Sequence, residues 1–116
     1  YRAQSVGSLT PGEQVVLLFE HAAVCISKAM KCIESKDICG AHNAIVKAQN
    51  IYEYLMDSLD MNFEISKNLY SLYDFILDRL VQANIKKDTE ILQQVLTMTR
   101  GFYDTWKQAE LKSRHS

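Results

Sequence analysis

Few residues in this chain interrupt a helix. It has one proline and four glycines among 116 residues, and these are the two residue types that most strongly break helical structure. The long segments between them carry apolar residues three and four positions apart, which is the period of an amphipathic helix. A chain of this length forms one domain with a sizeable core. The sequence therefore predicts a single all-α domain.

The sequence also lacks an excess of charge and any long apolar run. Its net charge is -1, and its lysines and arginines are spread among acidic neighbours, so we expect no nucleic-acid partner. No window approaches the apolar length that a membrane span needs, and no charged-then-apolar leader opens the sequence. We therefore expect neither direct membrane insertion nor a signal peptide.

Residue patterns typical of catalysis or metal binding are missing as well. There is no Cys-x-x-Cys or Glu-x-x-His pair, no glycine-rich phosphate loop, and no serine or cysteine with a sequence-readable base beside it. We expect no cofactor, no metal site and no enzymatic activity. One alternative is a histidine phosphotransfer bundle acting through His42, whose nearest following lysine is Lys47.

Three cysteines, Cys25, Cys32 and Cys39, are spaced by seven positions. Two turns apart on one helix side, Cys25 and Cys32 are separated by about 10 Å, which is too far for a disulfide. Free thiols are typical of a reducing compartment, so we expect a cytosolic protein.

Helix-start signals divide the chain into four helices, expected at about 11–35, 37–59, 64–85 and 88–111. Thr10 is a hydroxyl N-cap, with Pro11 at the first helical position and Glu13 three residues after the cap. Asp37 and Asp88 are N-caps of the second and fourth helices. Because the connections are short, the expected fold is an antiparallel up-down-up-down four-helix bundle.

The third and fourth helices have more apolar surface than one neighbour covers. At 65–84, a core strip consists of Leu69, Leu72, Ile76, Leu80 and Ala83. A second strip beside it consists of Tyr70, Leu77 and Val81, with Tyr73 on the border. The fourth helix has a core face of Ile91, Val95, Met98, Phe102 and Trp106, and a flanking strip of Leu92, Leu96 and Tyr103. A contiguous apolar patch outside the core usually marks an interaction site.

Short motifs along the whole chain resemble one known family. They are Tyr1 with Val6, Thr10-Pro11-x-Glu13, Val15 to Glu20, Lys47-Ala48-Gln49, Leu59-Asp60-Met61, Asn68-Leu69-x-x-Leu72-Tyr73-Asp74, Ala83-Asn84 and Asp104-x-Trp106. In this order and spacing, from Tyr1 to about Ala109, they are similar to the flagellar export chaperone FliS. The chain departs from the family at Phe19-Glu20-His21, where Tyr-Asp-Gly or Tyr-Asp-Ala is common, and at Asn62-Phe63, where a glycine pair is common.

The resemblance implies a cytoplasmic helical bundle that binds the C-terminal segment of flagellin, prevents premature polymerisation and delivers flagellin to an export gate component of the flagellar type III secretion apparatus. We hypothesise that amphipathic client helices lie in hydrophobic grooves. The residues assigned to these grooves are Tyr70, Tyr73, Leu77, Val81, Asn84, Leu92, Leu96 and Tyr103.

The N-terminal arm, residues 1–9, shows no helical period but contains Tyr1, Val6 and Leu9. We expect it to pack on the bundle and to cover part of a groove in the free chaperone. Three alternatives stay open: a wider core that takes up both apolar strips, an adaptor of the same fold for another flagellar client, and an Asn84 side chain that bonds its own chain.

Overall fold

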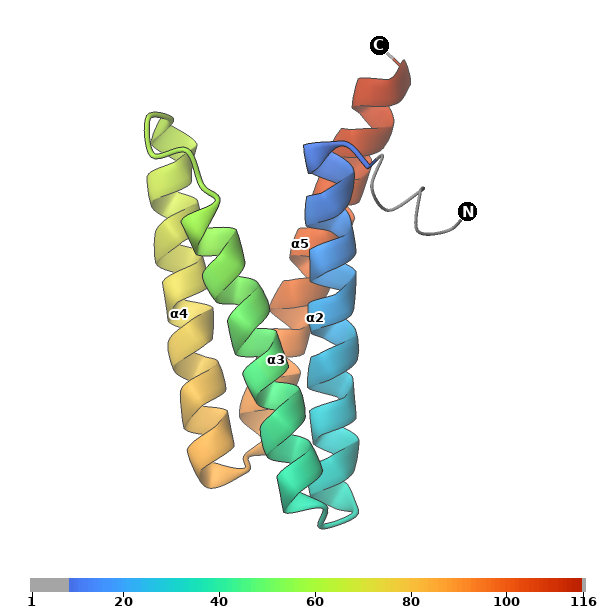
Figure 1. Cartoon of the computed structure of the whole chain (residues 1–116), viewed down its shortest axis with the longest axis vertical. Helices are drawn as coiled ribbons and strands as arrows, with labels where there is room; N and C mark the ends of the chain where they lie inside the picture. The colour runs from blue at the N-terminus through green and yellow to red at the C-terminus, as the bar shows by residue number, and fades with distance from the viewer. Residues whose placement is uncertain (1–8, 116) are drawn as a thin grey trace.

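The computed structural model describes residues 9–115 and, within this range, consists of four α-helices. They are α2 (Pro11–Glu34), α3 (Ile38–Asp57), α4 (Glu64–Lys86) and α5 (Thr89–His115). Successive helices run in opposite directions and pack against one another (Figure 1). The expected all-α bundle is confirmed, although α5 continues to His115, past the expected 111, and α3 stops at Asp57, before the expected 59.

Local hydrogen bonds fix where three of the helices begin. The Thr10 hydroxyl accepts a hydrogen bond from the Glu13 amide, and the Glu13 carboxylate accepts one from the Thr10 amide, which completes a capping box. Asp37 and Asp88 accept amide hydrogen bonds in a similar way at the starts of α3 and α5. These side chains satisfy N–H groups that the first helical turn leaves unpaired.

The helices form a ring in which each helix contacts two neighbours. Helix α2 packs against α3 and α5, and α4 packs against the other sides of the same two helices. The contact between α4 and α5 is the least extensive of the four. At the end of the molecule that carries the start of α2 and the end of α5, the α3–α4 hairpin leans away from these two helices (Figure 1). The bundle is therefore closed at one end and open at the other.

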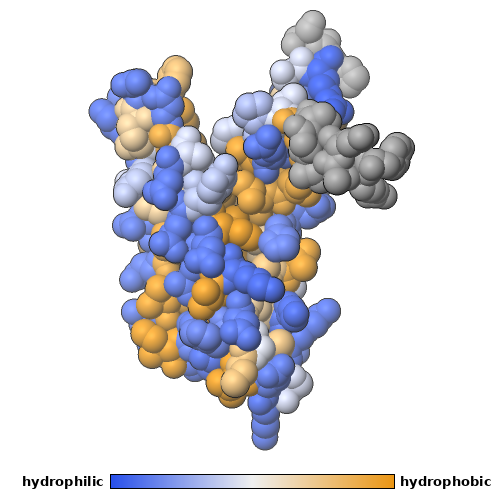
Figure 2. Space-filling model, in the orientation of Figure 1, coloured by the Kyte–Doolittle hydropathy of each residue, from blue (hydrophilic) through white to orange (hydrophobic). Residues whose placement is uncertain are grey.

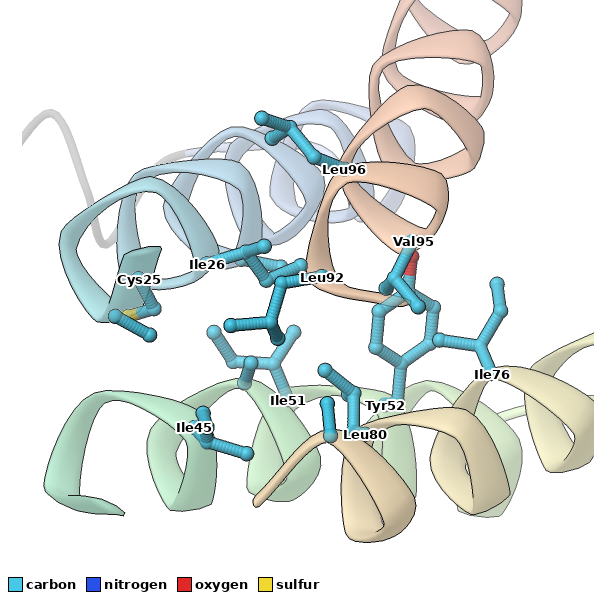
Figure 3. Close-up of a cluster of buried hydrophobic side chains, with 14 of the residues drawn as sticks. Cys25, Ile26, Ile45, Ile51, Tyr52, Ile76, Leu80, Leu92, Val95 and Leu96 are labelled. Atoms are coloured by element: carbon cyan, nitrogen blue, oxygen red, sulfur yellow. The ribbon is translucent and has the colours of Figure 1, made fainter. Parts of the chain in front are cut away.

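Four aromatic rings, one from each helix, occupy the centre of the core. Phe19, Tyr52 and Tyr73 are almost fully buried, and Phe102 packs against them. The centroids of the Phe19 and Phe102 rings are 5.3 Å apart, and those of Tyr52 and Tyr73 are 5.8 Å apart. Such ring pairs contribute about 0.5 to 1.5 kcal/mol beyond their buried area. Towards the closed end the core is aliphatic and includes Ile26, Ile45, Ile51, Ile76, Leu80 and Leu92 (Figure 3).

Leu72, which we assigned to the core strip of the third helix, lies outside the core and is 42% exposed. Ile38 is a second large apolar helix residue outside the core, with an exposed fraction of 51%. In α4 the buried stripe runs through Tyr73, Ile76 and Leu80, so Leu72 falls at its edge. Ile38 is the first residue of α3, at the tip of the bundle.

Candidate functional site

An apolar groove lies between α4 and α5 towards the open end of the bundle. We call it the α4–α5 groove and define it by the residues that line it: Ile65, Leu69, Met98, Gly101, Phe102, Thr105 and Trp106. Its volume is about 460 Å³. None of these side chains is ionisable, and Thr105 is the only one with a hydroxyl. The groove is therefore suited to holding apolar side chains of another molecule.

The floor of the α4–α5 groove is continuous with the core. The Phe102 ring stacks on Phe19 and lies edge-on to Tyr73, with the Phe102 and Tyr73 centroids 5.4 Å apart. Rings packed in this way have little freedom to rearrange. A guest that enters the groove meets a surface that is already in place, and this lowers the cost of binding.

Trp106, the only tryptophan of the chain, is linked to this floor. Burial raises the pKa of the Tyr73 phenol to about 12, and a hydrogen bond with the Trp106 side chain acts in the opposite direction. The Trp106 ring itself is half-buried. The indole is thus anchored on the core side while part of it remains open to whatever occupies the groove.

Large exposed apolar side chains gather on α4 and on the connection before it. Within the described residues they include Met61, Phe63, Ile65, Leu72 and Phe75, with exposed fractions between 42% and 63%. Figure 2 shows hydrophobic surface in the hollow between the two sides of the open end. Apolar surface of this kind usually marks an interaction site. The α4 helix therefore has the spare apolar surface that its sequence predicts, although other residues supply part of it.

The strip that we expected on α4 lies on the side facing α3, away from the α4–α5 groove. Tyr70 is 43% exposed, Val81 is 39% exposed, and Leu77 is half-buried against the core. Asn84 shares this side by its spacing from Leu77. Its Nδ2 lies 2.9 Å from Nδ1 of His42 on α3, and its Oδ1 accepts a hydrogen bond from Lys87. The Asn84 amide is therefore engaged with its own chain, as the alternative described.

Three residues that we expected to line the grooves are core residues, and this part of the prediction is wrong. Tyr73, Leu92 and Leu96 are 1%, 0% and 4% exposed. Each of α4 and α5 packs between two neighbours in the ring, so the side chains that we placed at the border or beside the core point to its centre. Tyr73 still contributes to the site, because its ring supports the groove floor.

Conversely, four residues that we assigned to the core line the α4–α5 groove, Leu69 on α4 and three residues on α5. Met98, Phe102 and Trp106 are only partly buried. Their spacing of four places them on one side of α5, and this is the only sequence signal that they belong together. The divergence of α4 from α5, which uncovers them, leaves no local mark in the sequence.

Tyr103 lies in a different, more polar cavity between α2 and α5. This cavity has a volume of about 640 Å³, and charged side chains at its edge include Lys28, Lys31, Arg100 and Asp104. The ammonium group of Lys107 lies 5.6 Å from the centroid of the Tyr103 ring, within cation–π range. The strips that we expected on α4 and α5 therefore face different sides of the bundle and do not form one shared groove.

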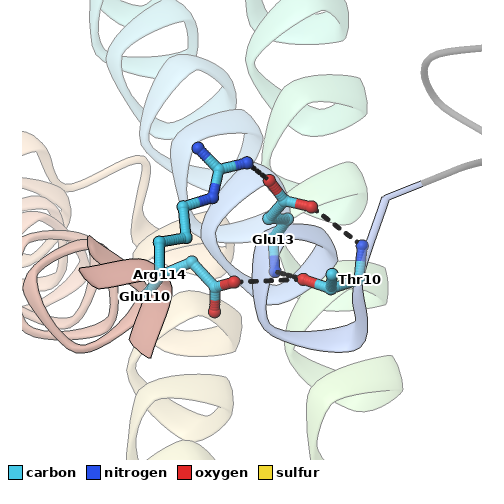
Figure 4. A network of polar contacts seen from close by, with 4 residues as sticks. All are labelled: Thr10, Glu13, Glu110 and Arg114. Atoms are coloured by element: carbon cyan, nitrogen blue, oxygen red, sulfur yellow. Dashed lines mark hydrogen bonds and ion pairs between the residues drawn. The ribbon is translucent and has the colours of Figure 1, made fainter. Parts of the chain in front are cut away.

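The N-terminal arm falls largely outside the described residues, and this includes Tyr1 and Val6. Leu9 is half-buried. Next to it a polar network joins the start of α2 to the end of α5: the Thr10 hydroxyl donates to Glu110, and Glu13 pairs with Arg114 (Figure 4). Leu9, the first described residue, therefore lies at the open end of the bundle (Figure 1).

The described residues contain no group of three or more His, Cys, Asp or Glu side chains placed to hold a metal ion. No helix among them is both long enough and apolar enough to cross a membrane. The three cysteines are free, and burial raises the pKa of the Cys25 thiol.

Comparison with known proteins identifies the family. Residues 1–113 match the family model for the flagellar protein FliS. The flagellar secretion chaperone FliS of Bacillus subtilis is 40% identical, with 99% of this chain and 89% of that protein covered. The chaperone of the same name from Salmonella typhimurium is 31% identical over 94% of this chain and 83% of its own length. These matches confirm the resemblance seen in the sequence, and they indicate a chaperone rather than an enzyme. The chain belongs to the FliS family of flagellar secretion chaperones.

Proposed function

We propose that this chain binds an amphipathic helix from the C-terminal segment of flagellin in the α4–α5 groove. Binding in the cytoplasm keeps flagellin from polymerising early, and the chaperone then delivers it to an export gate component of the type III apparatus. The observation that carries the proposal is an apolar groove with a floor of core aromatic rings, in a member of the FliS family. Amphipathic helices commonly bind in grooves of this kind.

The apolar character of the groove matches the energetic requirement of such a client. A disordered segment that folds on binding loses conformational entropy, and its contacts must offset this cost. Each well-buried apolar anchor stabilises the complex by about 1.5 to 3 kcal/mol. Phe102 and Trp106 offer broad faces for such anchors, and Ile65 and Leu69 form the facing wall.

Two further surfaces would contact a client longer than one helix. Tyr70, Leu77 and Val81 offer a shallower apolar strip on the α3-facing side of α4. Tyr103 offers a ring in the cavity between α2 and α5. Asn84 has no place in the proposal, because its amide already bonds within the chain.

The arm is proposed to shield apolar surface in the free chaperone. Tyr1 and Val6 supply apolar side chains, and Leu9, the last residue of the arm, is half-buried beside the start of α2 at the open end. Removing residues 1–8 should raise the affinity for the flagellin segment and lower the solubility of the free protein. If both stay unchanged, the arm has no covering role.

The test of the proposed function compares two isoleucines on α4. Ile65 is 63% exposed and lines the groove, whereas Ile85 is 71% exposed and lies near the other end of the helix, outside it. A flagellin C-terminal peptide is titrated into Ile65→Glu, Ile85→Glu and the parent, and binding is followed by calorimetry and by Trp106 fluorescence. A charge in the groove should weaken binding at least about tenfold, since one anchor is worth more than 1.4 kcal/mol.

Ile85→Glu is the matched control, because it adds the same charge to the same helix at an equally exposed isoleucine. Its affinity should stay within about twofold of the parent. Equal affinity of Ile65→Glu and the parent, with no change in Trp106 emission on binding, would rule out the α4–α5 groove as the binding site. A peptide from another flagellar protein that bound more tightly would favour the adaptor alternative.

A further inference from the structure

Arg79 lies on the same side of α4 as the wall of the α4–α5 groove. Ile65, Leu69, Leu72 and Arg79 are separated by four, three and seven positions, and this spacing keeps residues on one side of a helix. Arg79 lies about 21 Å from Ile65 along the helix axis, by the rise per residue of an α-helix. The apolar wall of the groove therefore leads along α4 to a positively charged side chain nearer the closed end.

The guanidinium of Arg79 has an unused hydrogen-bond donor. Its Nε is the only buried side-chain nitrogen or oxygen in the described part of the chain that has no hydrogen-bond partner. The residue as a whole is half-buried, and its neighbour Asp78 is exposed. The ion pair found among the described residues joins Arg114 to Glu13 and does not involve Arg79. A buried donor without a partner is costly, so this position favours a guest that supplies an acceptor.

We propose that Arg79 receives the free carboxylate at the C-terminus of the client helix; this inference rests on the proposed function of the α4–α5 groove. Arginine presents a planar fork of N–H donors that matches a carboxylate, and Nε together with one terminal nitrogen forms the bidentate pair. The C-terminal end of a helix is also its negative end, so its dipole adds to the attraction.

The shape of the bundle favours a guest helix whose C-terminus lies at Arg79. Helices α4 and α5 diverge towards the open end and converge towards their connection at Lys87 and Asp88 (Figure 1). A guest helix whose last residue lies at Arg79 needs no path onwards through the closed end. Its preceding turns then lie against Leu72, Leu69 and Ile65, so the guest runs parallel to α4. A span of about 21 Å corresponds to about four helical turns.

The experiment separates the terminal carboxylate from other acidic groups. Three forms of the flagellin C-terminal peptide are compared: the free acid, the C-terminal amide, and a form extended by a short glycine-serine tail. The parent protein should bind the free acid about tenfold more tightly than either of the other two, as expected for a charge-assisted bidentate pair. The extended form retains a carboxylate but places it beyond reach of Arg79.

Variants then assign the preference to Arg79. Arg79→Met keeps the apolar stem and should bind all three peptides with the weaker affinity, whereas Arg79→Lys should retain only part of the preference. Lys67→Met is the charge-matched control, because Lys67 is exposed on α4 and lines neither the α4–α5 groove nor the cavity between α2 and α5, and it should keep the full preference. Circular dichroism verifies that each variant is folded.

Two outcomes distinguish this inference from the function on which it rests. Equal affinity of the parent for acid and amide, with binding still lost in Ile65→Glu, overturns the role of Arg79 and leaves the groove as the client site. Undiminished binding by Ile65→Glu overturns the groove itself. A preference for the free acid that persists in Arg79→Met assigns the carboxylate to another residue and also overturns the inference.

Discussion

The hydroxyl groups of Tyr52 and Thr99 lie 2.6 Å apart and form a hydrogen bond inside the core. Both residues are fully buried. They join α3 to α5, two helices that lie diagonally across the ring and have no direct backbone packing. The bond therefore ties together opposite sides of the bundle, and burial accordingly raises the pKa of the Tyr52 phenol.

Replacing only Thr99 should lower the free energy of unfolding more than replacing both Tyr52 and Thr99. Thr99→Val leaves the Tyr52 hydroxyl buried without a partner and should lower the free energy of unfolding by about 1 to 3 kcal/mol. Tyr52→Phe should cost less, because the Thr99 hydroxyl can bond a carbonyl in the preceding turn of α5. The double variant should recover part of the loss. Urea unfolding of all four proteins measures the coupling, and strictly additive losses would show that the bond contributes nothing.

Replacing Gly101 with alanine should raise the stability of the protein but weaken its binding of the client. Gly101 lies within α5 and lines the α4–α5 groove, and a Cβ added there meets no atom within 4 Å. Gly101→Ala should therefore raise the free energy of unfolding by about 0.5 to 1 kcal/mol. The same methyl group projects into the groove and should weaken binding of the flagellin peptide.

The control for this change is Thr97→Ala, on an exposed part of α5 outside the groove. It also improves helix propensity, and it should leave the affinity for the peptide unchanged. If Gly101→Ala binds as tightly as the parent, the guest does not reach this part of α5.

Alkaline pH should unfold the protein through its buried phenols. The pKa of Tyr73 is raised from 10.0 to about 12 because the ring is removed from water, so the unfolded chain loses this proton first. The stabilisation is therefore complete below about pH 10 and is lost as the pH rises to about 12. Two pKa units correspond to roughly 2 to 3 kcal/mol. Urea unfolding followed by circular dichroism between these pH values measures the loss, and Tyr73→Phe should reduce it.

Acid should weaken the start of α2. The pKa of Glu13 is lowered, first by the hydrogen bond from the Thr10 amide and then by the charge of Arg114. Its contribution to stability is therefore present above the ordinary glutamate pKa and is lost as the pH falls through the lower value of the folded state. In Glu13→Gln, the midpoint temperature of thermal unfolding should depend less on pH in this acidic range. An unchanged profile would show that other carboxylates dominate acid unfolding.

Local sequence signals predicted the helix starts well. Thr10 with Glu13, Asp37 and Asp88 act within three residues of their own position, so the information is contained in short segments. The same holds for the number of helices and their antiparallel order, because short connections leave few other arrangements.

The rotation of the helices could not be read in the same way. Periodicity defines an apolar side of α4, but the centre of that side depends on where α3 and α5 lie. This is why Tyr73 is buried and Leu72 is exposed. Likewise, Phe102 and Trp106 carry the pattern of core residues, and only the divergence of α4 from α5 exposes them to a groove. The Tyr52–Thr99 bond links residues 47 positions apart, beyond the reach of any local pattern.

Because the bundle is open at one end, the stability of the chaperone should depend on how much client is available to bind it. Phe102 belongs to the groove floor and to the aromatic centre at once, so a client bound in the groove, as proposed, would add contacts directly to the core. A client at a hundredfold its dissociation constant adds about 2.7 kcal/mol to the free energy of unfolding. On the proposed function, a cell that holds much unexported flagellin should therefore also hold a chaperone that resists unfolding better, and depletion of flagellin should leave the chaperone more exposed to proteolysis.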